Sequence, residues 1–162
     1  MEINIVVADY SNAQHAKDIV FLLNRYALDP AGGGNGLSQY AQENLVRELA
    51  KLPFAFSIIS YVEDAPAGLI NCFTLFSTFK CKPLINIHDL VVLATYRKQG
   101  ISQLMLAEVE KIAREKGACK ITLEVLEKNY PAINSYTKFG FVGYELDPKY
   151  GNAIFLEKNL SE

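Results

Sequence analysis

The sequence predicts a single α/β domain (α+β in older schemes) with a mixed, mostly antiparallel sheet of about six or seven strands and helices on both faces. Short apolar runs of strand length alternate with amphipathic helical patterns along the chain. Two adjacent runs, 54–62 and 67–76, are separated by the turn residues 63–66, which is typical of an antiparallel hairpin. The 162 residues suffice for one core and contain no linker or repeat, so 1–162 are expected to form one domain.

The first strand and helix follow from periodicity. Residues 3–8 alternate loosely between apolar and polar, which predicts a strand. Ser11 and Gln14 have the spacing of a capping box. Apolar residues then recur at helical spacing as far as Leu28, just before Asp29-Pro30, and predict an amphipathic helix that ends there.

A glycine-rich segment separates this helix from the next one. Four of the six residues in 31–36 are glycine, including Gly33 and Gly34, so no regular element is expected there. The segment is either a flexible surface connector or a mobile lid over a binding site. Ser38 then caps a second helix, which Pro53 ends.

The centre of the chain combines a buried strand, a short loop and a helix start. Residues 85–92 are mainly β-branched and apolar but are interrupted by Asn86, His88 and Asp89. Two cations and Gly100 precede the next helix, whose first N–H groups have no intrahelical partners and attract anions. The sequence therefore predicts a phosphate site at this helix start. The helix has an apolar stripe of Ile101, Leu104, Met105, Val109 and Ile112.

The last third of the chain predicts three more strands and one helix. Residues 119–126 alternate and predict a strand, and 131–138 predict a helix with Pro131 at its first position, N1. Residues 141–145 and 152–156 are the last predicted strands.

Composition excludes several classes of function. A net charge of −2 favours neither nucleic acid nor an anionic membrane as partner. The N-terminus is too acidic for a signal peptide, and no apolar run approaches the ~20 residues of a membrane span. Three scattered cysteines fit reduced thiols, so a cytoplasmic protein is expected. No His/Cys set has metal-ligand spacing, and no metal is expected.

Two motifs carry a resemblance to a known family. The loop before the central helix resembles the pyrophosphate loop Arg/Gln-x-x-Gly-x-Gly/Ala of the GNAT superfamily of N-acetyltransferases, and residues 129–141 resemble the family's Asn-x-x-Ala-x-x-x-Tyr-x-x-x-Gly-Phe pattern. The string 86–90, Asn-Ile-His-Asp-Leu, is similar to that of a bacterial subgroup. The loop residues are Arg97, Lys98, Gln99, Gly100, Ile101 and Ser102.

The resemblance implies a cofactor, acetyl-CoA, and a place for it. In GNAT folds the two central strands splay apart, and the pantetheine arm of the cofactor enters the gap like an extra strand. That geometry implies that Leu90, Val91 and Val92 contact the pantetheine arm. It also implies that the loop residues 97–102 surround the pyrophosphate. Asn129 matches an asparagine that commonly bonds the pantetheine arm.

Three residues are the catalytic candidates. Tyr136 matches the family tyrosine near the cofactor sulfur, where it would protonate or hydrogen-bond the departing thiolate; otherwise it is a core aromatic. His88 and Asp89 match an acidic pair used near the amine by acetyltransferases that resemble the diamine group. An imidazole, with an ordinary pKa of ~6.5, is a suitable base for an ammonium proton. Glu124 is the back-up base.

The side chains of His88 and Asp89 would point to opposite faces of a regular strand. Neighbouring residues of a strand face opposite sides, so His88 and Asp89 share one pocket only if the strand bulges. Asn86 and His88 share a face and are expected to bind substrate, together with Gly33 and Gly34. The alternative is structural, with His88 in the core and Asp89 anchoring the turn.

The predicted function is transfer of an acetyl group from acetyl-CoA to a primary amine of a small molecule or peptide, by direct attack. One alternative is a longer acyl-CoA as donor. Another is a CoA-binding sensor without activity. Acceptor specificity is expected to depend on residues 29–37 and 77–83, and neither segment has a residue pattern that identifies the acceptor. The edge strands and the C-terminal strand pair are compatible with a homodimer.

Overall fold

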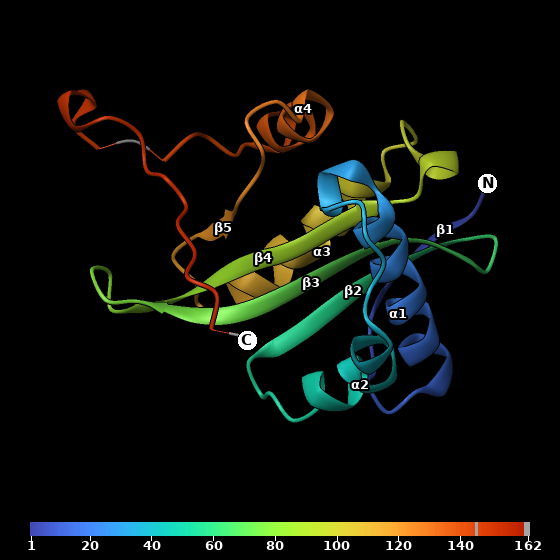
Figure 1. Ribbon diagram of the computed structural model, residues 1–162. Coiled ribbons are helices and arrows are strands. Elements are labelled where there is room, and N and C mark those ends of the chain that lie inside the picture. Colours follow the sequence, from blue (N-terminus) through green and yellow to red (C-terminus); the bar gives the residue numbers. More distant parts are fainter. Residues whose placement is uncertain (145, 161–162) are drawn as a thin grey trace.

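The computed structural model describes residues 1–144 and 146–160. Its framework is a five-stranded sheet in the order β1-β2-β3-β4-β5 (Figure 1). The first four strands are antiparallel neighbours, and β5 runs parallel to β4. The strands are β1 (Ile3–Val7), β2 (Ala55–Val62), β3 (Ala65–Ser77), β4 (Lys82–Val92) and β5 (Ile121–Leu123).

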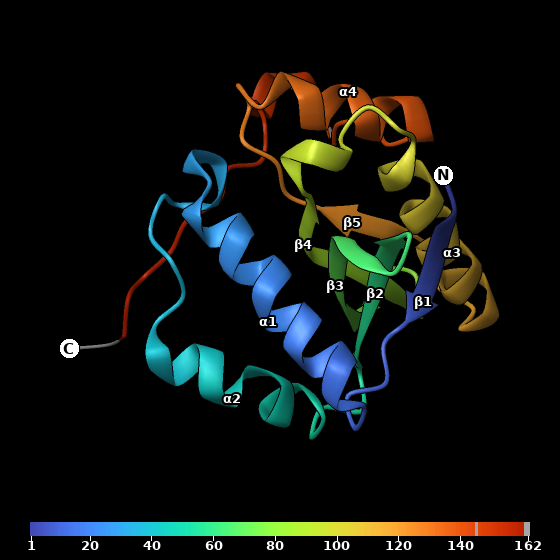
Figure 2. The same cartoon turned by 90° about the vertical axis from the view of Figure 1, so that its right-hand side faces the viewer.

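Helices cover both faces of this sheet, as predicted (Figure 2). Helices α1 (Ala13–Leu28) and α2 (Gln39–Leu49) pack on one face through a cluster that contains Ile19 and Leu22. Helices α3 (Ile101–Glu115) and α4 (Tyr130–Phe139) contribute to a larger cluster on the opposite face. Each large side chain buried in these clusters stabilises the fold by about 1.5–3 kcal/mol. Of the predicted α3 stripe, Leu104 is 46% exposed.

The predicted N-terminal capping box of α1 is wrong. Asn12 is the N-cap, and its side chain accepts from the backbone N–H groups of Gln14 and His15. Ser11 instead donates its hydroxyl proton to Asp9. The cap therefore lies one residue later than the Ser11–Gln14 spacing predicts, because an asparagine at that position satisfies two free N–H groups at once.

The glycine-rich segment is also more regular than expected. It begins with a short 3₁₀ helix, η1 (Pro30–Gly32), which the Asp29 side chain caps by accepting from Ala31 N. The Gly34 N–H returns to the Asp29 carbonyl. One aspartate thus holds the start of this segment against the end of α1. A second 3₁₀ turn, η2 (Ala94–Tyr96), follows β4.

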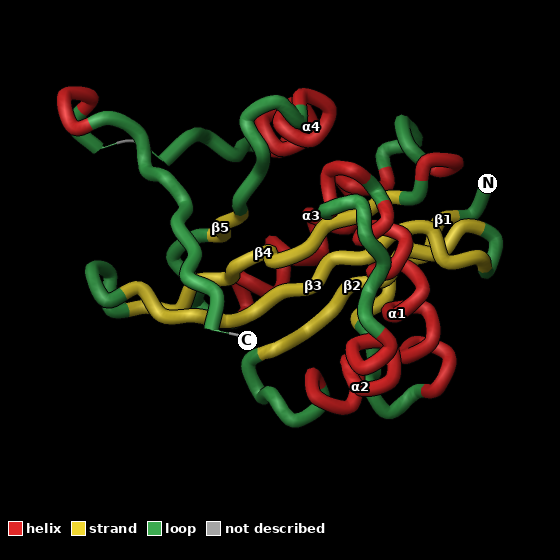
Figure 3. The backbone as a smooth tube through the Cα atoms, viewed as in Figure 1, coloured by secondary structure: helices red, strands yellow, loops and turns green. Residues whose placement is uncertain are grey.

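The predicted number of strands, six or seven, is wrong: the sheet has five in the described part of the chain. Residues 141–144 and 152–156 carry no strand, and Glu145 lies outside the described residues. We call residues 142–144 and 146–160 the C-terminal arm. The arm is drawn as loop except for one turn, η3 (Pro148–Tyr150) (Figure 3). Within residues 1–144 and 146–160 no strand pairs with the arm, and apolar alternation alone does not make a strand.

Candidate active site

The two central strands form a fork. β4 and β5 pair only from Ile85 to Ile87 and from Ile121 to Leu123. Beyond Leu123 the chain leaves the sheet toward α4, whereas β4 continues for five more residues as far as Val92. This stretch of β4 therefore has no strand neighbour on that side within the described chain.

The backbone of β4 presents hydrogen-bonding groups to the fork. The Leu93 N–H donates to the Ala67 carbonyl of β3 at 2.9 Å. Because the ladder of an antiparallel pair alternates, the polar groups of Leu90 and Val92 then face away from β3, toward the fork. The Val92 carbonyl agrees with this direction, since Arg97 donates its Nε–H to it at 2.9 Å. Such an edge is able to bind an extended amide-containing chain as a strand would.

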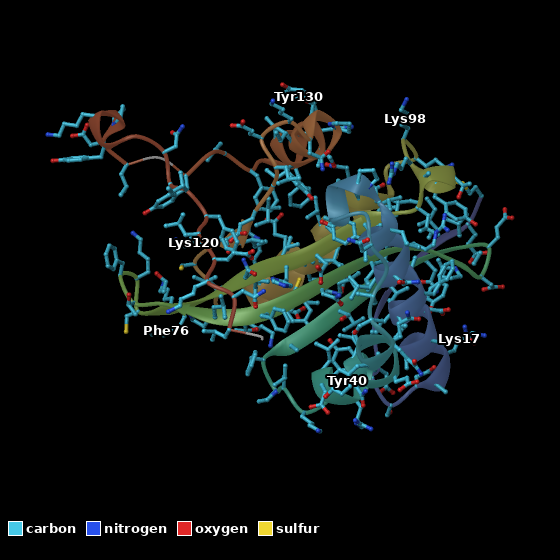
Figure 4. The ribbon with its side chains drawn as sticks, viewed as in Figure 1. Lys17, Tyr40, Phe76, Lys98, Lys120 and Tyr130 are labelled. Carbon is cyan, nitrogen blue, oxygen red and sulfur yellow. The ribbon has the colours of Figure 1, made fainter. Side chains whose placement is uncertain are left out.

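The start of α3 is open to an anion. Gly100 occupies the N-cap position with a φ of 80°, and no side chain caps the helix among the described residues. Lys98 also has a positive φ of 64°, and its side chain points outward from this loop (Figure 4). The Ser102 hydroxyl contacts that of Ser135 on α4 at 3.0 Å, so its side chain joins two helices. The free N–H groups and Lys98 are what a diphosphate requires.

Arg97 lies in the loop before α3, as the motif predicts, and contacts two other segments. Its guanidinium donates to the Val92 carbonyl and lies 3.4 Å from the Asp29 carboxylate. The contact joins the loop before α3 to the end of α1. Gln99 donates to the Thr95 carbonyl within the same loop, at 3.4 Å. Arg97 thus connects the α3 side of the fork to the glycine-rich segment.

The strand β4 bulges at the position where His88 and Asp89 require it in order to share a face. Asn71 of β3 pairs with Asp89, and the next residue, Cys72, pairs with Ile87, so His88 is an extra residue. Before the bulge Ile87 points into the α3 cluster, and after it Leu90 packs against that same cluster. The extra residue therefore puts Asp89 on the face covered by α1 and α2.

His88 lies on this same face. Its ring packs edge-on against Phe73, with ring centroids 5.6 Å apart, and it is exposed. Asn86 lies further down β4, opposite Thr122, to which its amide donates at 3.1 Å. That contact fastens β4 to β5 immediately below the fork. Because His88 is exposed, the structural alternative of a core histidine is excluded.

A row of hydrogen-bonded side chains crosses the sheet to Asp89. The Asn71 amide donates to the Asp89 carboxylate at 3.0 Å, and the Ser57 hydroxyl donates to the Asn71 oxygen at 2.7 Å. The Tyr10 hydroxyl lies 2.8 Å from that of Ser57. Because Ser57 spends its only proton on Asn71, Tyr10 is the donor to Ser57. Every donor in the row thus points toward the carboxylate.

Both inner members of this row are buried. Ser57 is 0% exposed and Asn71 is 4% exposed. They lie directly opposite each other on β2 and β3, and Asn71 lies opposite Asp89 on β4. A buried polar row of this kind fixes the orientation of its end group, since each unsatisfied member would cost about 1–3 kcal/mol.

Two tyrosines, on helices that cover opposite faces of the sheet, have raised pKa values. Burial raises the pKa of the Tyr26 phenol on α1, and the charges of Asp89 and Asp29 raise it further. Burial raises the pKa of Tyr136 on α4 to about 12, with Tyr26 adding to it. Tyr26 therefore interacts electrostatically with both Asp89 and Tyr136. Tyr136 also packs edge-on against Phe141, with centroids 5.9 Å apart.

Asn129 and Cys72 have clear local roles. Asn129 is the N-cap of α4, and its side-chain oxygen accepts from Ala132 N at 3.4 Å. Its amide N–H groups are not used by that cap. Cys72 is 1% exposed, and burial, aided by the charge of Asp89, raises the pKa of its thiol far above the ordinary value. A thiol held protonated in this way does not act as a nucleophile.

The glycine-rich segment borders the same region. A Cβ atom at Gly32 would lie 2.0 Å from the Tyr26 carbonyl oxygen, so the backbones approach closely there. Gly33 and Gly34 both have positive φ angles, and a Cβ at either would meet nothing within 4 Å. The segment therefore turns beside Tyr26 with its glycines facing open space.

The fold brings together most of the predicted residues. Those around the fork are Asp89, His88, Leu90, Val92, Arg97, Gly100 and Tyr136. Glu124 follows β5 and, with Tyr136, lines a cavity of about 1230 Å³. Sequence patterns do not reveal Tyr26 or the row Asn71–Ser57–Tyr10. Tyr26 looks like one more member of an apolar helical stripe, and no sequence signal joins the row, because it exists only across the sheet.

Known acetyltransferases match this chain in sequence. A family model for the acetyltransferase (GNAT) family matches residues 21–141. Streptothricin acetyltransferase of Streptomyces lavendulae is 36% identical over 63 residues, which cover 39% of this chain and 33% of that protein. Thialysine N-epsilon-acetyltransferase of Caenorhabditis elegans is 26% identical over 84 residues, which cover 52% of each chain. The chain thus spans at most about half the length of these two relatives.

Solved structures show the same fold. The structure of AAC(6')-Iy in complex with the bisubstrate analogue CoA-S-monomethyl-acetylneamine superposes with a TM-score of 0.76 at 18% identity, covering 98% of this chain and 99% of that one. At this identity the likeness concerns the fold alone. The family match covers most of the chain and includes the fork, the loop before α3 and α4. The chain therefore belongs to the acetyltransferase (GNAT) family.

Proposed function

We propose that the protein transfers an acetyl group from acetyl-CoA directly to a primary amine of a small, cationic molecule. Family membership supports an acyltransferase, and the choice of acceptor rests on Asp89. The observation that carries the proposal is the bulge at His88, which turns this hydrogen-bonded carboxylate toward the α1 face beside the fork. A fixed carboxylate at that place favours an ammonium group as ligand.

The residues around the fork fit coenzyme A. Within the described chain the β4 edge has no strand neighbour here, so the backbone groups of Leu90 and the N–H of Val92 are partners for amides, and the uncapped start of α3 offers N–H groups for a diphosphate. The bound cofactor would supply an activated thioester. The chain itself supplies position: β4 and α3 hold the donor, while Asp89 and the glycine-rich segment hold the acceptor. Proximity of this kind accounts for a large part of the rate of such reactions.

The acceptor amine must lose a proton before it attacks. Asp89 would hold the ammonium group, and His88, on the same face and exposed, would take the proton directly or through water. Asp29 adds a second negative charge near the end of α1, partly offset by Arg97. Two carboxylates on this side favour an acceptor with more than one positive charge, and the antibiotic and amino-acid names of the relatives agree with that class.

Tyr136 would stabilise the leaving thiolate by a hydrogen bond. Its pKa of about 12 keeps the phenol protonated at any working pH. Because burial raises this pKa, the phenol is a better hydrogen-bond donor to the thiolate than a full acid.

The decisive experiment measures thiol release from acetyl-CoA with neamine, streptothricin, thialysine and an alanine-terminated peptide as acceptors. We expect turnover with the polycationic small molecules and loss of at least about tenfold in kcat/KM for the amine in Asp89→Asn. Asp64→Asn, at the exposed β2–β3 turn, is the matched control and should keep full activity. Turnover with the peptide alone would overturn the proposed acceptor class.

The thiol-release assay, together with a melting-temperature measurement, decides between the two alternative functions. Faster turnover with succinyl- or propionyl-CoA than with acetyl-CoA would make the protein a longer-chain acyltransferase. A rise in melting temperature with CoA, but no thiol release with any amine, would make it a CoA-binding sensor.

A further inference from the structure

A line of aromatic rings crosses the sheet beside the polar row that ends at Asp89. Phe54 lies just before β2, Phe73 lies on β3 and His88 lies on β4. The ring centroids of Phe54 and Phe73 are 6.2 Å apart, and those of Phe73 and His88 are 5.6 Å apart. The three rings thus form one continuous aromatic surface from the start of β2 to β4.

This surface lies on the same face of the sheet as Asp89. Side chains two residues apart on a strand share a face, so Phe73 and Leu75 lie on the side of Asn71. The Asn71 amide donates to the Asp89 carboxylate at 3.0 Å. Leu84 of β4 lies directly opposite Leu75. The polar row and the aromatic surface therefore run side by side across the strands.

Helices α1 and α2 leave this surface uncovered. The buried cluster beneath them takes its sheet members from the other side of the polar row: Ile59, Leu69 and Val91. Phe54, Phe73 and Leu75 belong to neither buried cluster of the described chain. Phe54 is 43% exposed and Leu75 is 48% exposed. Figure 1 shows β3 and β4 continuing past α1 and α2 toward the turn between the two strands.

We propose that this surface binds an apolar, ring-sized group of the acceptor while Asp89 binds its ammonium group. We call it the aromatic subsite, and its residues are Phe54, Phe73, Leu75, Leu84 and His88. The inference rests on the proposed function, because it concerns the acceptor of the same reaction. Asp89 lies opposite Asn71, and a residue two positions along the partner strand is about 7–8 Å away, a distance that a chain of a few methylene groups spans.

The chemistry of the aromatic subsite favours an apolar group over a further charge. None of its side chains is acidic, so a second ammonium group gains no ion pair there. Contact with an apolar group removes surface of both partners from water, and an exposed apolar patch beside polar residues is typical of a ligand groove. The rings of Phe54 and Phe73 also pack favourably against a further ring. Among acceptors of equal charge, the protein should therefore select those with an apolar ring near the primary amine.

The first test compares two acceptors with the same number of amino groups, trimethylenediamine and its N-benzyl derivative. In the thiol-release assay we expect kcat/KM to be about tenfold higher for the benzyl derivative. Phe73→Ala should bring the two values within about twofold of each other. Leu75→Ser should reduce the preference by about threefold, and this half-exposed position remains informative where Phe73→Ala does not fold. The ratio is the readout, because loss of Phe73 also frees the His88 ring and so changes both rates alike.

Phe76→Ala is the matched control for these variants. Phe76 follows Leu75 on β3, lies at the same end of the sheet (Figure 4) and is 58% exposed. The alternation of side chains along the strand turns it to the opposite face. This variant should keep the full preference for the benzyl derivative.

The second test measures binding without turnover. Benzyltrimethylammonium and tetramethylammonium have no amine that can be acetylated. Calorimetry with CoA present should show about tenfold tighter binding of the benzyl cation to the native chain, and equal binding of both cations to Phe73→Ala.

The two tests separate failure of the subsite from failure of the proposed function. Equal binding of the two cations to the native chain, or turnover of the two diamines with equal kcat/KM, would overturn the aromatic subsite and leave the proposed function in place. Preferential binding of the benzyl cation without turnover of either diamine would overturn the proposed activity and support the subsite.

Discussion

The Asn71 amide donates to the Asp89 carboxylate across β3 and β4 at 3.0 Å, directly beside the bulge that His88 creates. The bond depends on the bulge, because in an unbroken register the carboxylate would point into the α3 cluster. It also ends the row that begins at Tyr10 and passes through Ser57. The orientation of the proposed amine-binding group is therefore set by three strands together.

Loss of this bond should affect the amine but not the cofactor. We expect Asn71→Leu to lower kcat/KM for the amine by about ten- to a hundredfold, because a hydrogen bond to a charged group contributes about 1.5–3 kcal/mol. The KM for acetyl-CoA should stay unchanged, since Asn71 does not reach the α3 start. Steady-state kinetics with each substrate varied in turn measures both constants.

The matched control for Asn71→Leu is Tyr61→Phe. Tyr61 donates to the buried Asp18 carboxylate at 2.7 Å, also between the sheet and α1, but away from the fork. Both variants should lower the free energy of unfolding by about 1–3 kcal/mol, since each removes a donor from a carboxylate. Equal losses of activity in the two variants would show that Asn71 acts through stability alone.

Local sequence patterns predict the parts of this protein that depend on local sequence. The loop before α3, the helix start at Ser38 and the hairpin of β2 and β3 all follow from neighbouring residues. Helix α4 begins at Tyr130, one residue before the predicted Pro131. The open helix start at Gly100 belongs to this class, because it depends on one positive φ angle.

The features that local sequence does not predict depend on pairing between distant segments of the chain. The bulge at His88 is decided by the register of β3 against β4, and the sequence presents it only as a condition for His88 and Asp89 to share a face. Residues 152–156 have the composition of a strand, but composition does not supply a neighbour. Tyr26 cannot be distinguished from a core aromatic in the sequence, since its distance from Asp89 arises in the folded chain.

Tyr136→Phe should lower kcat with little change in either KM. The ring packs against Phe141 and remains in place without the hydroxyl, so the loss reports the hydrogen bond to the leaving thiolate. We expect a fall of about ten- to a hundredfold, or about 1.4–2.8 kcal/mol. Tyr130→Phe, at the exposed start of the same helix, is the control. Undiminished turnover in Tyr136→Phe would leave the tyrosine a packing residue.

The two cations of the loop should behave differently when removed. Arg97 contacts both Val92 and Asp29, whereas Lys98 points into solvent. Arg97→Ala should therefore raise the KM for acetyl-CoA and for the amine, each by about three- to tenfold, and Lys98→Ala only the former. Titration calorimetry with CoA alone separates the two contributions. An Arg97→Ala variant with an unaltered amine KM would contradict the proposed link between the loop and Asp29.

Gly32→Ala should weaken amine binding. The added methyl group would lie 2.0 Å from the Tyr26 carbonyl oxygen, so η1 and the following glycines must move away from α1. We expect the amine KM to rise several-fold while the KM for acetyl-CoA is constant. Ala31→Ser, one residue earlier on the exposed side, provides the comparison. If both variants bind the amine like the native chain, the glycine-rich segment does not border the acceptor.

Alkaline pH should destabilise the fold, beginning with Cys72. Burial raises the pKa of this thiol in the folded protein, whereas in the unfolded chain it ionises near its ordinary pKa of ~8.5. Above that pH the unfolded chain binds fewer protons than the folded one. The stability contributed by Cys72 is therefore fully present below pH ~8.5 and falls above it by up to ~1.4 kcal/mol per pH unit.

Urea unfolding between pH ~8 and ~10 measures this slope before the tyrosines ionise. Cys72→Ala should lower the free energy of unfolding at neutral pH, because it leaves a small cavity, but should flatten its decline with pH. Cys119→Ala is the control, since Cys119 is an exposed free cysteine. A native slope that persists in Cys72→Ala would assign the alkaline loss to another group, of which Tyr10 and Tyr26, whose pKa values burial also raises, are the next candidates.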